Sequence, residues 1–138
     1  MADNRTDSQR TETMRAVRGK DTQPEWFVRR LLHGQGYRYR LHDTRLPGKP
    51  DLVFASRRKA VFVHGCFWHA HGCRYGQPPK SKLDFWLPKL AANRRRDARQ
   101  RAQLRALGWS VLTVWQCETR RPESLERKLR RFLDRRCD

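Results

Sequence analysis

One short segment, residues 61–73, concentrates side chains that bind metals or transfer protons. It holds three of the five histidines and two of the four cysteines of the 138-residue sequence. Its first residues are apolar enough to form a strand, and two large aromatics, Phe67 and Trp68, follow without any regular spacing. Because an ordinary core does not gather so many ligands and rings, we interpret this segment as a catalytic loop braced by a metal ion.

Four residues have the types and the spacing of a structural zinc site. Cys66, His71 and Cys73 lie in this loop, and Cys117 follows the last predicted strand. Two or three ligands from a loop with one from a neighbouring strand end are typical of closed tetrahedral sites, and thiolates with one imidazole select zinc. Such an ion would stabilise the loop. The alternative is that Cys117 is a buried core thiol and the other cysteines are incidental; Cys137 we interpret as a free thiol.

Asp51 indicates a second kind of site. It follows a proline at the start of an apolar strand, residues 51–55, and the return strand covers residues 60–64. Many nucleases hold Mg²⁺ with a carboxylate in this position. The familiar pattern, Pro-Asp followed by Asp/Glu-x-Lys, would place its second carboxylate and its lysine at Val63 and Gly65, which lack those groups. The alternative is that Asp51 only caps the start of its strand.

Other groups can fill this gap. The carbonyl of Val63 could be the second oxygen ligand, because Mg²⁺ accepts backbone carbonyls. His69 could replace the lysine as the base, since an imidazole with a pKa near ~6.5 suits proton transfer at neutral pH. His64 and Glu25 are candidates to hold the outer waters of the metal. We assign no role to the remaining two histidines.

Two aromatic pairs, Phe67–Trp68 and Phe85–Trp86, lie beside arginine-rich sequence. Rings in such a setting can stack on bases or wedge between base pairs. Wedging costs a few kcal/mol of unstacking at each step, so it favours sites that a mismatch has already weakened. The alternative is that one ring of each pair belongs to the core, and for Phe85 we prefer this alternative.

The charge of the chain points to a polyanionic partner. Lys and Arg number 32 against 14 Asp and Glu, which gives a net charge of +18 that is spread along the whole chain. Nucleic acid is the first candidate, because solubility alone does not require this much charge. A membrane partner is disfavoured because no basic helix has a wide apolar face, and no run approaches the ~20 apolar residues of a membrane span. The N-terminus has no apolar signal region, so we expect a cytoplasmic protein, in which cysteines bind metals more often than they form disulfides.

The elements that must position these groups alternate between helices and strands. The order predicts one α/β domain, residues 1–138, with a mixed sheet flanked by helices. We predict loose residues 1–12, helices over 13–17, 24–34, 84–107 and 122–136, and strands over 37–41, 51–55, 60–64 and 109–115. Thr22 should cap the second helix and Gly108 should end the third. The buried stripe of the helix over 84–107 is expected at Leu83, Leu87, Leu90, Ala91, Ala98 and Ala102.

Several motifs in this sequence match one family. They are Phe-Val-His-Gly-Cys-Phe-Trp-His at 62–69 with His71 and Cys73, Leu-Pro-Gly-Lys-Pro-Asp at 46–51, Asp-Phe-Trp at 84–86 with Lys89, Asn93, Arg96 and Asp97, and Leu-Gly-Trp at 107–109 through Val114, Trp115 and Cys117. With Met-Arg-Ala at 14–16, they resemble the very-short-patch repair (Vsr-type) DNA mismatch endonucleases over about residues 14–117.

This resemblance implies a restriction-endonuclease-like fold with a structural zinc site. It implies an enzyme that nicks one DNA strand next to the thymine of a T·G mismatch, the product of 5-methylcytosine deamination, and so initiates very short patch repair. Asp51 and the Val63 carbonyl would bind Mg²⁺, Glu25 and His64 would reach the ion through waters, and His69 would be the base. Asp97 could orient that histidine.

The resemblance also implies a DNA interface. Phe67, Trp68 and Trp86 would intercalate from the major-groove side, with Met14 opposite. Two further residues, Lys89 and Asn93, would touch the mismatch. The partners would be double-stranded T·G-mismatched DNA and a MutL-type repair protein, and we expect a nucleoid-associated monomer. The competing hypotheses are a zinc-braced DNA-binding module without catalysis and an RNA-binding protein that uses its rings as stacking platforms.

Overall fold

The computed structural model describes residues 22–69, 71–73, 76–77 and 80–135. The predicted loose segment 1–12, the predicted helix over 13–17, Met14 and Cys137 lie outside this part of the chain. Among the described residues, no helix combines the length and the apolar composition that crossing a membrane requires.

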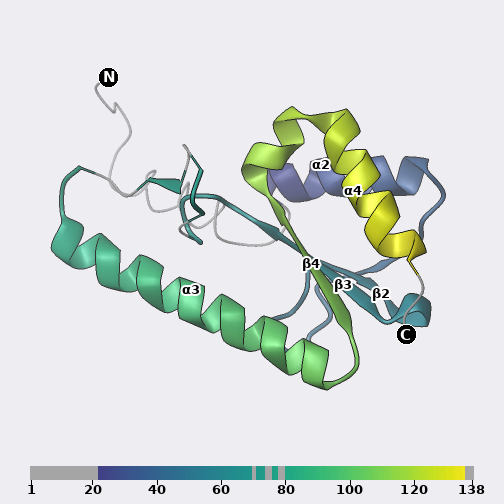
Figure 1. Ribbon diagram of the computed structural model, residues 1–138, viewed down its shortest axis with the longest axis horizontal. Helices are drawn as coiled ribbons and strands as arrows, with labels where there is room; N and C mark the ends of the chain where they lie inside the picture. Colours follow the sequence, from purple (N-terminus) through teal and green to yellow (C-terminus); the bar gives the residue numbers. More distant parts are fainter. Residues whose placement is uncertain (1–21, 70, 74–75, 78–79, 136–138) are drawn as a thin grey trace.

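A four-stranded mixed sheet forms the centre of the molecule (Figure 1). Its order is β1 (Arg40–Leu41), β2 (Leu52–Phe54), β3 (Lys59–His64) and β4 (Ser110–Trp115). The first three strands pair antiparallel, whereas β3 and β4 pair parallel with Lys59 opposite Ser110 and His64 opposite Trp115. The prediction of a mixed α/β sheet flanked by helices is therefore confirmed. The predicted strand over 37–41 is wrong in length, since only its last two residues pair.

The helices cover both faces of this sheet. One face packs against α2 (Gln23–Gly34) and α4 (Pro122–Asp134), which bury apolar residues against Val61 and Val63 of β3. On the opposite face, Ala60 and Phe62 pack near the C-terminal end of α3 (Leu83–Ala106). Because side chains alternate along a strand, His64 shares the α3 face with Ala60 and Phe62. This alternation sets the direction in which each functional group of β3 points.

Short-range signals account for most element ends. The side chain of Thr22 accepts a hydrogen bond from the Glu25 amide at the start of α2, and Gly108 turns the chain after α3 with a φ of +90°. Two 3₁₀ segments, η1 (Ala55–Arg57) and η3 (Gln116–Arg120), connect β2 to β3 and β4 to α4. Apart from the start of β1, the strand ends lie within a residue or two of the prediction.

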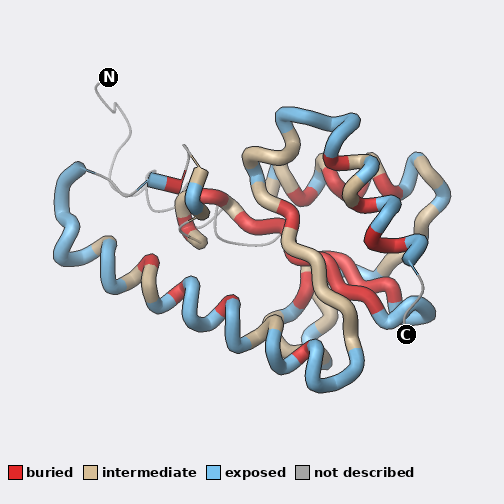
Figure 2. Tube along the Cα trace, viewed as in Figure 1, coloured by how far each residue is buried: buried red, intermediate tan, exposed pale blue. Residues whose placement is uncertain are grey.

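The helix α3 contradicts the predicted buried stripe. Figures 1 and 2 show that its N-terminal half extends beyond the sheet and that most of its surface is exposed. Leu83 and Leu87 are 41% and 49% exposed, and Ala98 and Ala102 are exposed as well. Of the expected stripe, Leu90 is buried and Ala91 is half-buried. The buried positions of the helix are Leu90, Asn93, Asp97 and Leu104.

The polar residues Asn93 and Asp97 explain this difference. Both lie inward because groups of the loop after β3 satisfy them: the Asn93 amide donates to the Trp68 carbonyl at 2.9 Å, and Asp97 pairs with His69. A prediction from hydrophobic periodicity assigns polar residues such as Asn93 and Asp97 to the solvent-exposed face of the helix. The helix also contains Pro88, one turn after its first residues, where the proline ring leaves the backbone without a donor.

Candidate active site and metal centres

Three polar clusters gather near the end of the sheet where β3 finishes. Each offers at least three ligand atoms that lie within 4.8 Å of one another. The first cluster contains Glu25, His42 and Asp51, the second His64, His69 and Asp97, and the third Cys66, His71, Cys73 and Cys117. The sequence therefore located most of the groups that the fold brings together.

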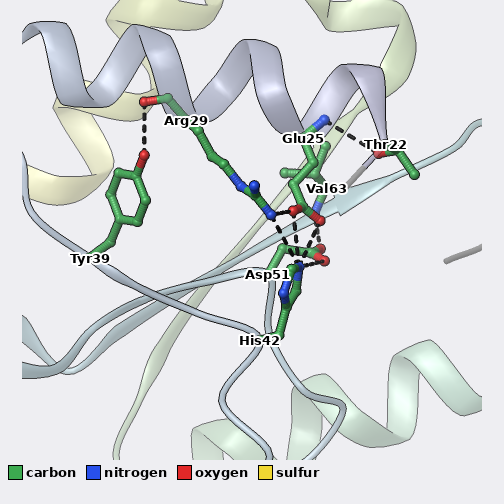
Figure 3. A network of polar contacts seen from close by, with 7 residues as sticks. All are labelled: Thr22, Glu25, Arg29, Tyr39, His42, Asp51 and Val63. Carbon is green, nitrogen blue, oxygen red and sulfur yellow. Dashed lines mark hydrogen bonds and ion pairs between the residues drawn. The ribbon is translucent and has the colours of Figure 1, made fainter. Parts of the chain in front are cut away.

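The first cluster joins α2 to the β2–β3 hairpin. Figure 3 shows Glu25 and Arg29 extending from α2 toward His42 and Asp51. Nε2 of His42 lies 2.9 Å from Oε2 of Glu25 and 3.9 Å from Oδ1 of Asp51, while Arg29 pairs with Glu25. The Val63 amide donates to Oδ2 of Asp51 at 2.7 Å. Val63, whose carbonyl was predicted to bind Mg²⁺ together with Asp51, therefore holds the Asp51 carboxyl across the hairpin.

His42 is a member of this cluster that the sequence reasoning missed. Its backbone has a φ of 49°, a left-handed conformation that is uncommon outside glycine, and its amide donates to the Asp51 carbonyl at 3.2 Å. This conformation turns the imidazole between the two carboxylates of the cluster. The available signal was positional, since His42 directly follows the strand that pairs with β2.

The electrostatic surroundings of Asp51 favour a bound cation. Burial raises the pKa of Asp51, while the Val63 amide and the positive charges of His42, His69 and Arg29 lower it in part. A carboxyl that is desolvated in this way gains more from a cation than an exposed one does. Asp51 accepts a hydrogen bond from the Val63 amide and His69 stacks on the next residue, His64, so both groups lie at the same end of β3.

The second cluster holds an imidazole in a fixed orientation. Nδ1 of His69 hydrogen-bonds to Oδ2 of Asp97, and its ring stacks on that of His64 with centroids 3.7 Å apart and an interplanar angle of 4°. Burial alone would raise the pKa of Asp97, but the hydrogen bond and charge of His69 lower it below its usual value. A carboxylate bonded to Nδ1 leaves Nε2 of His69 as the nitrogen that can exchange a proton with a substrate.

His64 remains neutral in this arrangement. Burial, followed by the charge of His69, lowers the pKa of His64 to about 3. Its Nδ1 atom is buried without a hydrogen-bond partner among the described residues. An unsatisfied buried nitrogen beside a carboxylate cluster is the type of group that an ordered water can satisfy. This observation fits a hydrated cation held by Asp51.

The third cluster links the loop after β3 to η3. Sγ of Cys117 lies 3.7 Å from Nδ1 of His71, and the Cys117 amide donates to Sγ of Cys66 at 3.4 Å. The His71 ring stacks on Trp115 with centroids 4.1 Å apart. In a tetrahedral zinc site the sulfurs lie about 3.8 Å apart, so this donor set fits zinc with little rearrangement.

Without a metal ion these thiols are in their neutral form. Burial raises the pKa of Cys66 to about 12 and also raises that of Cys117. A thiolate in this place needs a compensating positive charge, and a coordinated metal deprotonates thiols outright. The cluster could therefore hold a soft divalent ion and bind it with release of protons.

The predicted DNA-contacting rings form one aromatic cluster. Trp86 lies 5.3 Å from Phe67 and 5.7 Å from Trp68, measured between ring centroids. Nζ of Lys89 lies 5.5 to 5.9 Å from the ring centroids of Phe85, Trp68 and Trp86. The preferred assignment of Phe85 to the core is wrong, because its side chain is 59% exposed.

Within this cluster the rings differ in exposure. Trp68 is only 5% exposed, whereas Phe67 and Trp86 are half-buried. The side chain of Asn93 is buried; it donates to the Trp68 carbonyl and accepts a hydrogen bond from Arg96 at 3.1 Å. Asn93 thereby fixes the loop that carries the rings. Met14 lies outside the described residues.

Comparisons with known proteins identify relatives of this chain. A family model described as DNA mismatch endonuclease Vsr matches residues 2–75, more than half of the chain. The chain is 57% identical over 134 residues to Type II nicking enzyme V.XorIIP of Xanthomonas oryzae pv. oryzae, covering 97% of this chain and 98% of that protein. It is 43% identical over 125 residues to DNA mismatch endonuclease Vsr of Escherichia coli, covering 91% and 80% of the two chains. It is also 41% identical over 133 residues to Type II nicking enzyme V.NmeAIP of Neisseria meningitidis, covering 96% and 95%.

Proposed function

The chain belongs to the DNA mismatch endonuclease Vsr family, and from this membership we propose that it nicks DNA next to the thymine of a T·G mismatch by Mg²⁺-dependent hydrolysis. The family membership confirms the resemblance that the sequence motifs indicated. The observation that supports the rest of the proposal is that Asp51 and the Asp97-bound imidazole of His69 contact successive residues of β3: the Val63 amide donates to Asp51, and the His69 ring stacks on His64. A base beside a cation site is what phosphodiester hydrolysis requires.

The carboxylate cluster would hold the magnesium ion. Asp51 and the Val63 carbonyl would be its protein ligands, while Glu25 and the orphaned Nδ1 of His64 would hold its waters. When bound, Mg²⁺ would neutralise the charge that develops on the phosphate. His42 would keep Glu25 and Asp51 in place through its contacts with both carboxylates.

His69 would act as the general base. Its Nε2 atom would accept the proton of the attacking water, and the Asp97 carboxylate would hold the correct tautomer and stabilise the resulting imidazolium. The stacked His64 ring, which stays neutral, would restrict the rotation of His69 without adding a second positive charge. This division of roles follows from the burial that lowers the pKa of His64 and from the hydrogen bond that Asp97 makes to His69.

A structural zinc ion would stabilise the loop that carries His69. Cys66, His71, Cys73 and Cys117 would coordinate it, and three of these ligands flank His69 in the sequence. We further propose that Phe67, Trp68 and Trp86 wedge into the base stack at the mismatch, with Lys89, Asn93 and Met14 also at the DNA interface. Burial of Trp68 means that this ring would have to move outward to reach a base step.

A nicking assay tests this function. The protein is incubated with Mg²⁺ and strand-labelled duplexes that carry either one T·G mismatch or the matched C·G pair. The expected result is one nick, on the thymine strand of the mismatched duplex, and no nick after Asp51→Ala. Equal cutting of both duplexes would refute mismatch recognition. Tight binding without any cutting would favour the non-catalytic DNA-binding module.

The proposed function also includes action as a monomer, assisted by a MutL-type repair protein.

A further inference from the structure

A basic groove follows the free edge of β4, away from the three clusters. Its volume is about 640 Å³, and it is bounded by the C-terminal end of α3, the first half of β4 and one face of α4. Arg105, Arg127, Arg131 and Arg135 line it, and Trp109 and Phe132 contribute aromatic surface. We name this feature the edge groove.

The edge groove is separate from the candidate active site. It borders Ser110 to Leu112 of β4, which pair with Lys59 to Val61, whereas the clusters lie around Val63, His64 and the chain after Trp115, at the other end of the same strands. Three residues of extended chain separate Leu112 from Trp115, a distance of roughly 10 Å. A ligand in the edge groove therefore contacts none of the proposed catalytic residues.

The four arginines of the edge groove have no ion-pair partner among the described residues. Nearby carboxylates are engaged elsewhere: Glu118 pairs with Lys128, and Glu126 lies 3.9 Å from Arg130. Asp134, at the end of α4, contacts Tyr37 and Arg57. Among the described residues, no carboxylate forms an ion pair with these four arginines, and Glu123, one turn before Arg127, can offset only part of their charge; the groove therefore favours an anionic occupant.

The edge of β4 disfavours an added peptide strand as that occupant. The Thr113 carbonyl accepts a hydrogen bond from Lys128 at 3.3 Å, and the Trp115 amide donates to Glu118 at 2.9 Å. An extended peptide that paired with β4 would find these backbone groups already satisfied. Backbone pairing in the groove would be confined to Ser110–Leu112, so side chains must hold most of the occupant.

The spacing of the basic groups suits a repeating anion. Arg127, Arg131 and Arg135 recur every four residues, so the first two lie on one face of α4, about 6 Å apart along its axis. Arginine forks bind phosphate oxygens in pairs, and an aromatic floor such as Trp109 suits sugars and bases. We propose that the edge groove binds the phosphodiester backbone of DNA as a second site, beyond the nicking function proposed above.

Binding measurements on charge-matched variants test this proposal. The groove variant combines Arg127→Gln with Arg131→Gln, and the control variant combines Arg121→Gln with Arg130→Gln on the same helix. All four side chains are exposed, so folding should be preserved, and thermal unfolding checks this. Affinity is measured across a salt series in buffer without added Mg²⁺ or chelator, for a matched duplex and for a single strand of equal length. Because no mismatch or divalent ion is used, the outcome does not depend on nicking.

The expected result is a weaker salt dependence in the groove variant alone. Removal of one arginine–phosphate interaction should reduce the slope of log K against log salt by about 0.9 for duplex or 0.7 for single strand, so the slope of the double variant should fall by roughly 2 or 1.4. The arm with the larger reduction identifies the form of DNA that is bound. Equal slopes in both variants, or no change in either, would overturn the proposal. The proposal would also fail if the groove variant kept its affinity for DNA but lost its affinity for a polyglutamate peptide, because that result would indicate an acidic protein partner.

Discussion

At the scale of single residues, the carboxyl of Asp51 links function to stability. Its raised pKa means that it stabilises the fold only below its unfolded pKa, near 3.8, and that this stabilisation is lost as the pH rises through the higher folded pKa. At pH 7 the group therefore destabilises the folded protein. A site built to bind a cation carries this cost whenever the cation is absent.

We predict that Asp51→Asn abolishes nicking but raises the melting temperature of the metal-free protein at pH 7. The asparagine oxygen can still accept the Val63 amide, so the hairpin contact survives. Adding Mg²⁺ should raise the melting temperature of the wild type and leave that of Asp51→Asn unchanged. Calorimetry with and without Mg²⁺ checks this, and a variant that is less stable than the wild type would contradict it.

His64 should make the fold sensitive to mild acid. Its folded pKa is lowered to about 3 from 6.5, so its contribution to stability is present above pH 6.5 and is lost as the pH falls toward 3. At pH 5 the loss should be about 2 kcal/mol, from ~1.36 kcal/mol for each pH unit below 6.5. Urea unfolding at pH 7 and pH 5 should show a smaller loss for His64→Gln than for the wild type. Equal losses would show that other groups control the acid response.

The same scale shows what a single sequence could and could not indicate. Asp51, His69 and the four zinc-ligand candidates stand out because few other roles suit such residues in short loops. His42 does not stand out, because its role depends on a left-handed backbone that turns it between Glu25 and Asp51. A conformation of this kind is decided by the surrounding fold and leaves no mark on composition.

At the scale of elements, the helix α3 positions the loop after β3 through polar contacts. Its start and its stop at Gly108 were predicted within a residue, but its buried face was wrong. The inward residues Asn93 and Asp97 are satisfied by the loop itself, so the helix and the loop specify each other. The hydrophobic periodicity of a helix indicates which face meets an apolar core, so it cannot reveal that α3 packs against a loop through polar side chains.

We predict that Asp97→Asn lowers the single-turnover nicking rate by about 100- to 10,000-fold, the upper figure being the loss seen when the aspartate that orients a general-base histidine becomes asparagine. The amide can still hydrogen-bond to His69 but no longer stabilises the charged ring. DNA affinity should change little, because Asp97 is buried. An exposed substitution on the same helix, Gln103→Ala, serves as the control. A loss of affinity with an unchanged rate would contradict the proposed role.

The cysteine cluster connects the loop after β3 to η3. We predict that Cys66→Ser loses the zinc ion and lowers the melting temperature, since a metal that binds only the folded state adds its binding free energy to stability. Native mass spectrometry and calorimetry measure both quantities. Cys137→Ser should retain both metal and stability. A fully stable, active Cys66→Ser protein would remove the structural metal from the mechanism.

At the scale of the whole molecule, charge is divided between surface and interior. Most arginines lie outward, whereas Glu25 and Asp97 are 1% and 6% exposed in the clusters. The net charge of +18 attracts DNA over distance, while the buried carboxylates act only on what reaches the sheet end. Attraction and chemistry therefore depend on different residues.

We predict that salt separates these two processes. If about six phosphates are contacted, raising salt from about 50 to 200 mM should weaken binding to a T·G duplex on the order of 1,000-fold. The nicking rate at saturating protein should remain nearly constant, because buried groups are screened little by salt. Single-turnover kinetics over a protein titration measure both quantities. A rate that falls in parallel with affinity would show that surface charge also contributes to the chemical step.

Pro88 gives the aromatic end of α3 a freedom that the rest of the helix lacks. Because its nitrogen has no proton, the turn that carries Trp86 is attached to the remainder of the rod by one hydrogen bond fewer. Tilting that turn is therefore less costly here than at any later position along α3. The Trp86 indole could move toward an opened base step while Asp97, nine residues after Pro88, stays hydrogen-bonded to His69. Pro88 would then act as a hinge between a mobile N-terminal turn and the fixed remainder of α3.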